Sequence, residues 1–554
     1  MEKQLWKGCE EGNVEEVRKL LQNEQININW QNDSDYLSTP FYVACEKGQI
    51  EIVKLLLNDR RVEINKGDSE RRTPFYVACY HGYIEIVKLL LNDQRIEINK
   101  ANKHEVTPFF LVCYKGQIEV VKILLNDKRI DINKARNDGA TPFYIACYRR
   151  HIEIVKLLLK DERVDINQAN IFNETPIYIA CYEGHLDIVK LLLNDEKVDI
   201  NKSDNSVGAT PLYIACFKGH IEIVKLLLND ERVDFNKANK NDVTPFYVAC
   251  RNRDIEIVTL LLNDKKVDIN KPGNSVGATP LYIVCEKAHI EIVKIILNNE
   301  RVDINKANND NETPFFVACE KGHTEIVRLL LNDKRVDLNK SQNQGATPFY
   351  IACQKEYTEI VKLLSSDERI DINKTNNSGD TPLSIACYYG KTEVVKLLLN
   401  SQRVDVNKAY NFGETPFYIA CQKEHTKIVE LLLNNRIVDI NKANNNNETP
   451  FFSACENGYI EIVKILLNDQ RVDINKANNF GETLFYTACK KGHIDIVKLL
   501  LNDKRVSIKK KANYGEIAVD IAKEENHSNI VNLIKEFDTG NYHLTFLYFV
   551  GKKM

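Results

Sequence analysis

The sequence has 554 residues, of which 75 are basic and 78 acidic, and its formal net charge is −3. This balance lacks the excess of Lys and Arg typical of nucleic-acid binding, so we expect no nucleic-acid partner. The N-terminus, MEKQLWKGCEEGN, has no apolar signal segment, and no run of about 18 apolar residues could span a bilayer. We therefore expect a soluble cytoplasmic protein, with the nucleus as the alternative, and no integral membrane segment.

In chain order, the segment around Cys9 is an altered first copy of a unit that repeats along the chain. Later copies open with a Thr-Pro pair at steps of 34 residues, or 35 at two places, and 13 of the 14 prolines lie in these pairs. A further copy has Leu484 after Thr483, and a degenerate last copy starts near Ile517. Sixteen such units would fill 544 of the 554 residues, which predicts one stack of repeats without a separate catalytic domain. The pairs begin at Thr39, Thr73, Thr107, Thr141, Thr175, Thr210, Thr244, Thr279, Thr313, Thr347, Thr381, Thr415 and Thr449.

The unit from Thr141 shows the elements expected in every repeat. Threonine is a favourable N-cap and Pro142 a favourable first helical residue, so a helix should begin here. Phe143, Ala146 and Cys147 follow at helical spacing and predict its buried face. The segment IEIVKLLL predicts a second, antiparallel helix. RVDIN then alternates before an Asn- and Gly-rich turn, which predicts a β-hairpin finger.

The cysteines and histidines recur at fixed places in the repeat. All 15 cysteines, from Cys9 to Cys489, share one small-residue core position, so we expect buried and unreactive thiols. Packed helices lie about 8–10 Å apart, whereas a disulfide needs Cα atoms within about 7 Å, so these thiols should be free. His81 follows Cys79 by two residues but has no counterpart in most units. Seven other histidines lie at the corner between the helices, which indicates a structural role: His151, His185, His220, His289, His323, His425 and His493.

No other motif for chemistry is present. The spacing of Cys and His does not match a metal site, and there is no phosphate-binding Gly loop or catalytic motif. We therefore expect no cofactor, no metal and no enzymatic activity.

The opening of the unit reads TPFYVA at Thr39, TPLYIA at Thr210 and TPLSIA at Thr381. With its Gly-His corner, as at Gly184 and His185, the unit resembles the ankyrin repeat, whose opening is TPLHxA. The resemblance covers essentially the whole chain. It implies an all-α solenoid with short β-hairpin fingers, an ankyrin-repeat superhelix of helix-turn-helix-hairpin units.

Two features depart from the family pattern. The family's histidine three residues after the threonine is mostly tyrosine here, which puts its usual local hydrogen bond in question. The corner glycine is replaced in five units, by Arg150, Arg253, Ala288, Glu356 and Glu424.

The expected domain boundaries follow the repeats. Residues 1–38 should form an N-terminal capping repeat, 39–516 about 14 tandem repeats and 517–538 a degenerate C-terminal capping repeat, because a solenoid needs polar outer faces at its ends. Residues 539–554 form a tail that contains LTFLYFVGKK, which is too short to span a membrane. We expect this tail to fold over the last helices, with a lipid or partner anchor as the alternative.

The residue after the cysteine is aromatic in five consecutive repeats, and each of these aromatics lies four residues after another. Residues at i and i+4 share a helix face, and tyrosine is common in binding surfaces, so we expect ten rings to line one groove. The rings are Tyr76, Tyr80, Phe110, Tyr114, Tyr144, Tyr148, Tyr178, Tyr182, Tyr213 and Phe217. The next residues, His81, Lys115, Arg149 and Glu183, would add polar discrimination.

Four finger residues break a second rule. Most fingers have Gly or Asn two residues before the threonine, which suits a left-handed turn. Leu37, Arg71, Glu105 and Asp242 stand there instead, three of them in repeats 2 to 4. Since such exceptions gather at functional sites, Leu37, Arg71 and Glu105 join the ten rings in a predicted partner site over repeats 2 to 7. The alternative is that the aromatic content reflects drift and codon bias, with the tyrosines packing between units.

These observations favour a monomeric, non-catalytic scaffold that binds a protein partner through its concave groove and hairpin tips. The alternative function is a peripheral membrane adaptor that uses the apolar C-terminal tail. The least favoured hypothesis is a thiol enzyme or redox sensor.

Overall fold

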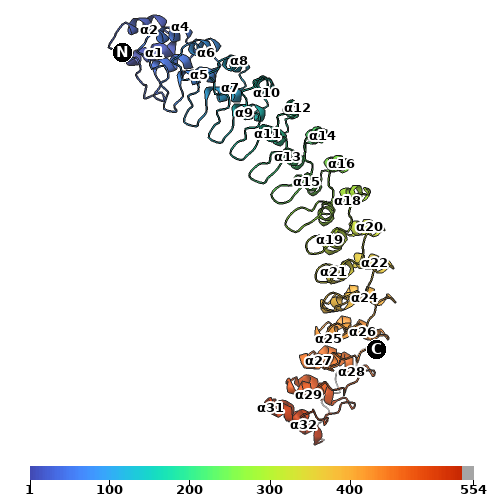
Figure 1. Ribbon diagram of the computed structural model, residues 1–554. Coiled ribbons are helices and arrows are strands. Elements are labelled where there is room, and N and C mark those ends of the chain that lie inside the picture. The colour runs from blue at the N-terminus through green and yellow to red at the C-terminus, as the bar shows by residue number, and fades with distance from the viewer. Residues whose placement is uncertain (540–554) are drawn as a thin grey trace, which may run out of the picture. The chain divides into compact units, whose positions relative to one another are not determined.

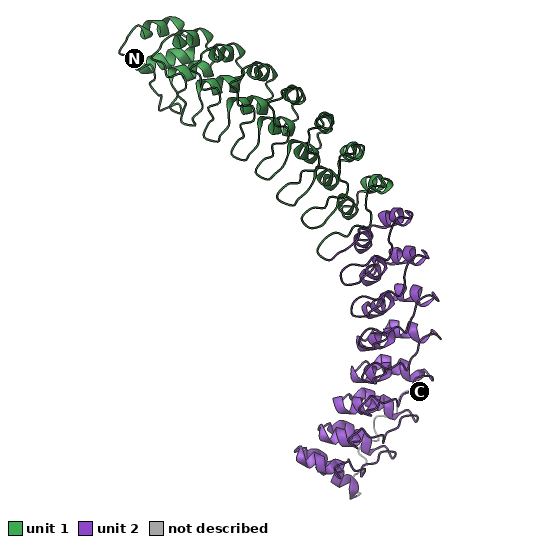
Figure 2. Cartoon of the chain, in the orientation of Figure 1, with its two compact units in different colours: residues 1–275 green, residues 276–554 purple. Residues whose placement is uncertain are grey.

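The computed structural model describes residues 1–539, which contain 32 helices arranged as one pair per repeat. Within each of the two compact units of the chain, odd-numbered helices lie in one row, even-numbered helices lie in a second row, and the fingers project beyond the odd-numbered row (Figure 1). The chain divides into two compact units, Met1–Ser275 and Val276–Met554 (Figure 2).

The helices of the first unit are short, and most have seven or eight residues. Its odd-numbered helices are α1 (Glu2–Glu11), α3 (Pro40–Glu46), α5 (Pro74–His81), α7 (Pro108–Lys115), α9 (Pro142–Tyr148), α11 (Pro176–Glu183), α13 (Pro211–Lys218) and α15 (Pro245–Arg251). Its even-numbered helices are α2 (Val14–Leu21), α4 (Ile50–Leu57), α6 (Ile84–Leu91), α8 (Ile118–Leu125), α10 (Ile152–Leu159), α12 (Leu186–Leu193), α14 (Ile221–Leu228) and α16 (Ile255–Asn263).

The second unit repeats the pattern. Its odd-numbered helices are α17 (Pro280–Glu286), α19 (Pro314–Lys321), α21 (Pro348–Lys355), α23 (Pro382–Tyr388), α25 (Pro416–Gln422), α27 (Pro450–Asn457), α29 (Leu484–Lys490) and α31 (Ala518–Glu524). Its even-numbered helices are α18 (Ile290–Leu297), α20 (Thr324–Leu331), α22 (Thr358–Ser365), α24 (Thr392–Leu399), α26 (Thr426–Asn434), α28 (Ile460–Leu467), α30 (Ile494–Leu501) and α32 (Ser528–Asp538).

The odd-numbered helices from α3 to α29 begin at the predicted threonines. In α9, the Thr141 hydroxyl accepts a hydrogen bond from the Tyr144 N–H at 3.0 Å, and Pro142 occupies the first helical position. In α29, which lacks the proline, the Thr483 hydroxyl still accepts from the Tyr486 N–H at 3.3 Å. Each cap stabilises its helix by about 1 kcal/mol. The predicted helix starts are confirmed.

The core lies between the two rows of helices and runs from repeat to repeat. Phe143, Ala146 and Cys147 of α9 are at most 1% exposed, and Val155 and Leu158 of α10 are completely buried. α9 packs against α7 and α11, and the small side chains of Ala146 and Cys147 permit this close approach. The all-α solenoid is confirmed.

The fingers are turns rather than two-stranded hairpins. Within residues 1–539, extended pairing is confined to the isolated bridges Asn32↔Ser38 and Ala477↔Thr483. The segment 163–167, predicted as a strand, has its backbone groups engaged by the preceding repeat. Asn133 Nδ2 donates to the Arg163 carbonyl oxygen at 2.7 Å, and Asn133 Oδ1 accepts from the Asp165 N–H at 2.9 Å. Backbone N–H and C=O groups that could pair across a hairpin therefore bond to an asparagine side chain of the preceding repeat.

We call the asparagines that make this pair of bonds the asparagine ladder. Each one occupies the last position of the RVDIN segment or its equivalent, and each bonds to the same segment of the next repeat. The members are Asn29, Asn65, Asn99, Asn133, Asn167, Asn201, Asn236, Asn305, Asn339, Asn373, Asn407, Asn441 and Asn475.

Arginines at the finger bases also link neighbouring repeats. Arg95 pairs with Asp93 at 2.6 Å, and the same guanidinium donates to the Leu57 carbonyl of the previous repeat at 3.0 Å. The hydrogen bond from Arg95 lowers the pKa of Asp93 below its ordinary value of 3.8. We call these contacts the arginine latches, and the others use Arg61, Arg129, Arg163, Arg232, Arg335, Arg369, Arg471 and Arg505.

Acid should weaken the stack through these latches. A carboxylate whose folded-state pKa is lowered contributes stability above its unfolded pKa of about 3.9, and this contribution is lost as pH falls through the folded pKa. We expect the midpoint of thermal unfolding to drop below about pH 4, with Asp93→Asn less stable than the natural chain at pH 7. The gap between the two proteins should shrink as pH falls, and an unchanged gap at low pH would show that Asp93 does not titrate with folding.

The capping roles of residues 1–38 and 517–538 stay predictions. The expected contact of the tail with the last helices lies outside the described residues, apart from Thr539. Among residues 1–539, no helix combines the length and apolar character needed to cross a membrane.

Candidate functional site

Cys79 and His81 do not form a nucleophile with its base. Cys79 is completely buried, and burial raises the pKa of its thiol, so the thiol stays protonated. His81 lies at the surface, where its ring stacks on Tyr83 at 5.4 Å and meets Tyr80 edge-on at 5.0 Å. All 15 cysteines are free and buried, as predicted. In the described part of the chain, no cluster of three His, Cys, Asp or Glu side chains could hold a metal ion.

The corner histidines link one repeat to the next. His151 Nε2 lies 3.0 Å from the Tyr114 carbonyl oxygen, and because a carbonyl only accepts, Nε2 is the donor. The His151 ring covers Gly116, where an added Cβ would lie 2.7 Å from the ring. Their predicted structural role is confirmed for the histidines with the same bond, at 2.9–3.1 Å: His151, His185, His220, His323, His425 and His493.

Five of the ten rings expected in the groove are buried instead, which corrects that prediction. Their exposed fractions are only 2–7%. The position three residues after the threonine faces the next finger, where Asn102 Nδ2 donates to the Tyr76 hydroxyl at 3.2 Å and the Tyr144 hydroxyl donates to Glu174 at 3.2 Å. Burial raises the pKa of Tyr76 to about 12. The buried rings are Tyr76, Phe110, Tyr144, Tyr178 and Tyr213.

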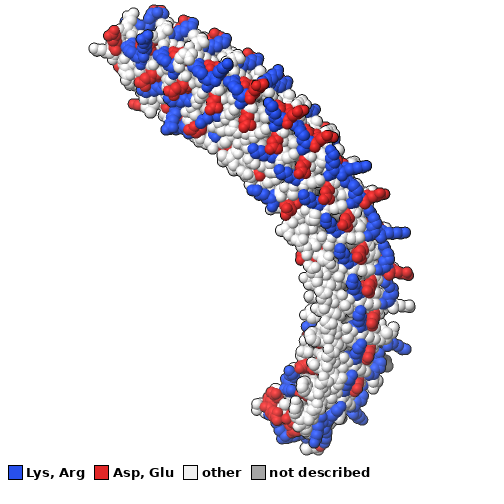
Figure 3. Space-filling model, in the orientation of Figure 1, with Lys and Arg blue, Asp and Glu red and all other residues white. Residues whose placement is uncertain are grey.

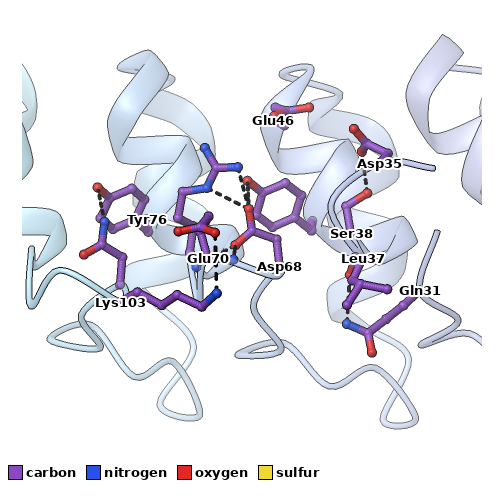
Figure 4. A network of polar contacts seen from close by, with 12 residues as sticks. Gln31, Asp35, Leu37, Ser38, Glu46, Asp68, Glu70, Tyr76 and Lys103 are labelled. Atoms are coloured by element: carbon purple, nitrogen blue, oxygen red, sulfur yellow. Dashed lines mark hydrogen bonds and ion pairs between the residues drawn. The ribbon is translucent and has the colours of Figure 1, made fainter. Parts of the chain in front are cut away.

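These bonds also show what the tyrosine does in place of the family's histidine. Its hydroxyl bonds to the finger that follows the second helix of the same repeat, as from Tyr76 to Asn102 and from Tyr144 to Glu174. Figure 4 shows Tyr76 turned towards the finger that carries Lys103. One repeat earlier, the buried carboxylate of Asp68 accepts from the Tyr42 hydroxyl at 3.2 Å and from Arg72 Nε at 2.7 Å. The hydroxyl therefore ties the first helix of a repeat to the finger that follows in that repeat.

The unusual finger residues adopt the left-handed backbone that glycine would favour. Leu37, Arg71, Glu105 and Asp242 have φ between 56° and 59°. This conformation costs roughly 1 kcal/mol for a residue with a side chain. The Gln31 amide donates to the Leu37 carbonyl at 2.8 Å and thereby supports the first finger (Figure 4). Leu37, Arg71 and Glu105 are exposed, as a contact surface requires.

The other five rings are accessible and lie at the C-terminal ends of α5, α7, α9, α11 and α13. Tyr80, Tyr148, Tyr182 and Phe217 are 36–43% exposed, and Tyr114 is half-buried. A polar side chain occupies the same position in other repeats, so the fold does not need an aromatic ring there. These side chains include Glu46, Gln354 and Lys490.

Cations from the following repeat cover three of these rings. Lys115 Nζ lies 4.3 Å from the centroid of the Tyr80 ring, and Lys218 Nζ lies 3.9 Å from that of Tyr182. The guanidinium carbon of Arg149 lies 4.3 Å above the Tyr114 ring, and Arg149 also donates to the Tyr114 hydroxyl. We call this surface the aromatic–cation row: Tyr80, Tyr114, Lys115, Arg149, Tyr148, Tyr182, Phe217 and Lys218.

Sequence reasoning missed part of this arrangement. Lys218 was not predicted, although the signal is present: the residue after the aromatic position is basic in three of the five repeats. Reasoning from sequence also missed Ile171 and Phe172, which are 60% and 53% exposed at a fingertip of the same unit. An apolar pair between asparagines, in NIFN, is the signal for that tip.

The aromatic–cation row contains three positively charged side chains. Lys115, Arg149 and Lys218 are exposed, and none of them forms an ion pair within 4.0 Å in the described residues. In the second unit, by contrast, Lys321 at the equivalent position pairs with Glu320 at 3.0 Å. Where charged side chains appear on the visible face of each unit, Lys and Arg lie next to Asp and Glu (Figure 3). The row therefore combines three cations that form no ion pair with the tyrosine rings that they cover.

Capped helix pairs, turn-like fingers and bonds that recur between successive repeats define a solenoid of stacked helix pairs. The family model described as ankyrin repeats (3 copies) matches residues 5–102, 95–170, 177–272, 266–342, 334–409 and 383–478. A second, described as ankyrin repeats (many copies), matches residues 468–522. The chain therefore belongs to the ankyrin repeat family.

The comparison with curated proteins found no match. Among solved structures, the crystal structure of EF0377, an ankyrin repeat protein, is 29% identical with a TM-score of 0.33. The match covers 35% of this chain and 99% of that chain. Ankyrin repeats are generally protein-interaction modules and are typically non-catalytic.

Proposed function

We propose that this protein is a non-catalytic scaffold that binds a protein partner through the aromatic–cation row, bordered by the fingertips of repeats 2 to 4. The observation that carries the proposal is the run of five accessible aromatic rings at one helix position, accompanied by three cations without ion pairs. Tyrosine and arginine are the residues that most often dominate binding energy, because they offer large contact area and polar tips.

Two observations favour binding over simple packing between units. Side chains of the row are more than a third exposed at four of the five rings, so much of their apolar area stays in water. The rings also end at Arg251 and Glu286, although the helices continue in the same form. Drift alone gives no reason for five consecutive aromatics at a position that the core does not use.

The fingertips support the same location. Leu37, Arg71 and Glu105 retain a strained backbone that glycine would relieve, and strain of this kind tends to persist at functional sites. The exposed side chains of Ile171 and Phe172 add apolar surface on a finger of the same unit. We assign these fingertips to the rim of the partner site.

The test removes two rings of the row. Replacing Tyr148 and Tyr182 with Ala should weaken binding of an identified partner about 30-fold or more, since truncating a central tyrosine typically costs about 2 kcal/mol. Binding is measured by titration with a partner obtained by affinity capture on the natural chain. Because both rings are exposed, the unfolding midpoint should change little.

The matched control is Tyr388→Ala. Tyr388 occupies the same helix position in the second unit, is 44% exposed and has Lys423 Nζ 4.5 Å from its ring centroid. The repeats before and after it have Gln354 and Gln422 at this position, so Tyr388 is not part of a run of aromatic rings. This variant should bind the partner like the natural chain. Loss of stability with unchanged binding in the double variant would contradict the proposal.

A further inference from the structure

We propose that the aromatic–cation row binds an acidic segment of the partner in polyproline II conformation. Every third side chain of this segment would face the row, and successive facing side chains would meet successive repeats. This inference rests on the proposed function, because it names the chemistry of the partner at the same surface. Its carboxylates would meet Lys115, Arg149 and Lys218.

The positions of the three cations favour an anionic ligand. Each ammonium or guanidinium is held against a tyrosine ring, at 3.9–4.3 Å from the centroid, instead of against a carboxylate. A lysine over a ring still has N–H donors that point away from it, and a ring-held side chain loses less conformational freedom on binding. The row therefore offers positioned donors without a built-in counterion.

The spacing of the repeats selects the conformation of the ligand. Packed helices lie about 8–10 Å apart, so equivalent side chains of successive repeats recur at about that distance. A polyproline II helix advances about 3.1 Å per residue with three residues per turn, so every third side chain faces the same way at intervals of about 9.3 Å. A β-strand does not match, because residues three apart point to opposite faces. Aromatic grooves also suit the ridged, preformed surface of polyproline II.

The order of charges along the row predicts a pattern in the ligand. Lys115 and Arg149 belong to consecutive repeats, Glu183 occupies the equivalent position in the next, and Lys218 follows. Glu183 is exposed, so a carboxylate placed opposite it would be repelled. The ligand residues that face Lys115, Arg149 and Lys218, at positions one, four and ten of the segment, should therefore be acidic. The residue at position seven, which faces Glu183, should be basic.

The experiment uses the full chain and labelled ten-residue peptides. EPPEPPKPPE and its reversed sequence cover the two directions in which a segment can lie, and fluorescence anisotropy gives the Kd. One of the two should bind at least about tenfold more tightly than KPPEPPEPPE and its reverse, which have the same composition but place the lysine opposite a cation of the row and a glutamate opposite Glu183. Equal binding of the matched and misordered peptides would overturn the inference.

Three variants of the chain test the location of the site. Changing Lys115 and Arg149 to Glu should weaken binding of the matched peptide at least about tenfold, whereas Lys321→Glu at the equivalent position of the second unit should leave it unchanged. Glu183→Lys should reverse the preference at position seven, so that EPPEPPEPPE binds more tightly than EPPEPPKPPE. Thermal unfolding confirms that each variant is folded.

The outcomes separate this inference from the function on which it rests. If no peptide binds but the Tyr148 and Tyr182 double variant still loses its partner, the acidic polyproline II ligand is wrong and the scaffold function stands. If the double variant keeps its partner, the proposed function fails. Tighter binding of a helical peptide with Glu at every seventh residue would overturn the polyproline II conformation, because seven helical residues also span about 10 Å.

Discussion

Asn99→Ala is expected to lower the free energy of unfolding by about 2–3 kcal/mol, a large effect for a residue outside the apolar core. Asn99 Nδ2 donates to the Arg129 carbonyl oxygen at 2.7 Å, and Asn99 Oδ1 accepts from the Asp131 N–H at 2.9 Å. Alanine removes both bonds and leaves two backbone groups of the next repeat without their partner. Denaturant unfolding measures the loss.

Two further variants make this test specific. Asn99→Asp keeps an acceptor for the Asp131 N–H but loses the donor to Arg129, so its loss should be intermediate. Asn137→Ala changes an exposed finger asparagine for which no side-chain hydrogen bond is found in residues 1–539, and should cost at most about 0.5 kcal/mol. Equal costs for Asn99→Ala and Asn137→Ala would show that the asparagine ladder does not stabilise the stack.

Hydrogen exchange gives a local measure of the same prediction. A long repeat array need not unfold in one step, because each repeat contacts only its neighbours. In Asn99→Ala, the Asp131 N–H should exchange about 30-fold faster or more, which corresponds to a loss of about 2 kcal/mol. Amides of distant repeats should exchange as in the natural chain.

The 15 cysteines should be unreactive in the folded protein and all should become reactive on unfolding. Every one of them is buried and free, and burial raises the pKa of Cys79 and Cys147, which disfavours the reactive thiolate. We expect a thiol probe at neutral pH to react at least about 100-fold more slowly than with an unstructured cysteine, because reaction requires local opening. Mass spectrometry counts the modified thiols.

The unfolded chain in denaturant is the control for probe access, and it should take up 15 labels. A cysteine that reacts quickly in the folded state would revive the thiol enzyme or redox hypothesis, and its position would identify the site. Uniform protection would instead match a core in which the cysteines fill small gaps between helices.

Much of the fold was predictable because it depends on short-range features that recur. A Thr-Pro pair such as Thr141 and Pro142 starts a helix in each repeat that contains it. The 34-residue period then places a cysteine, such as Cys147, at one equivalent core position. The corner histidines were predicted to be structural from their recurrence alone. In each case one repeat contains the information, and the other copies confirm the pattern.

The candidate site was predictable only in part. Tyr76 and Tyr80 lie four residues apart on one helix, yet Tyr76 is 5% exposed and Tyr80 is 42% exposed. Helical spacing gives the direction of a side chain, but its burial depends on the finger that follows in the same repeat, where Asn102 bonds to Tyr76. Lys218 was missed because its ring partner Tyr182 lies in another repeat.

The sequence by itself determined the repeat, its two helices, their caps and the identity of the core residues, because these follow from local propensity and from the periodicity of apolar residues. Only the tertiary structure decided that the fingers are turns, which rings remain accessible and which cations cover them. Those outcomes depend on bonds between residues about 26 to 38 positions apart, as from Tyr76 to Asn102 within one repeat and from Leu57 to Arg95 between two repeats. Local pattern carries no information on such pairs until the chain is folded and the repeats are stacked.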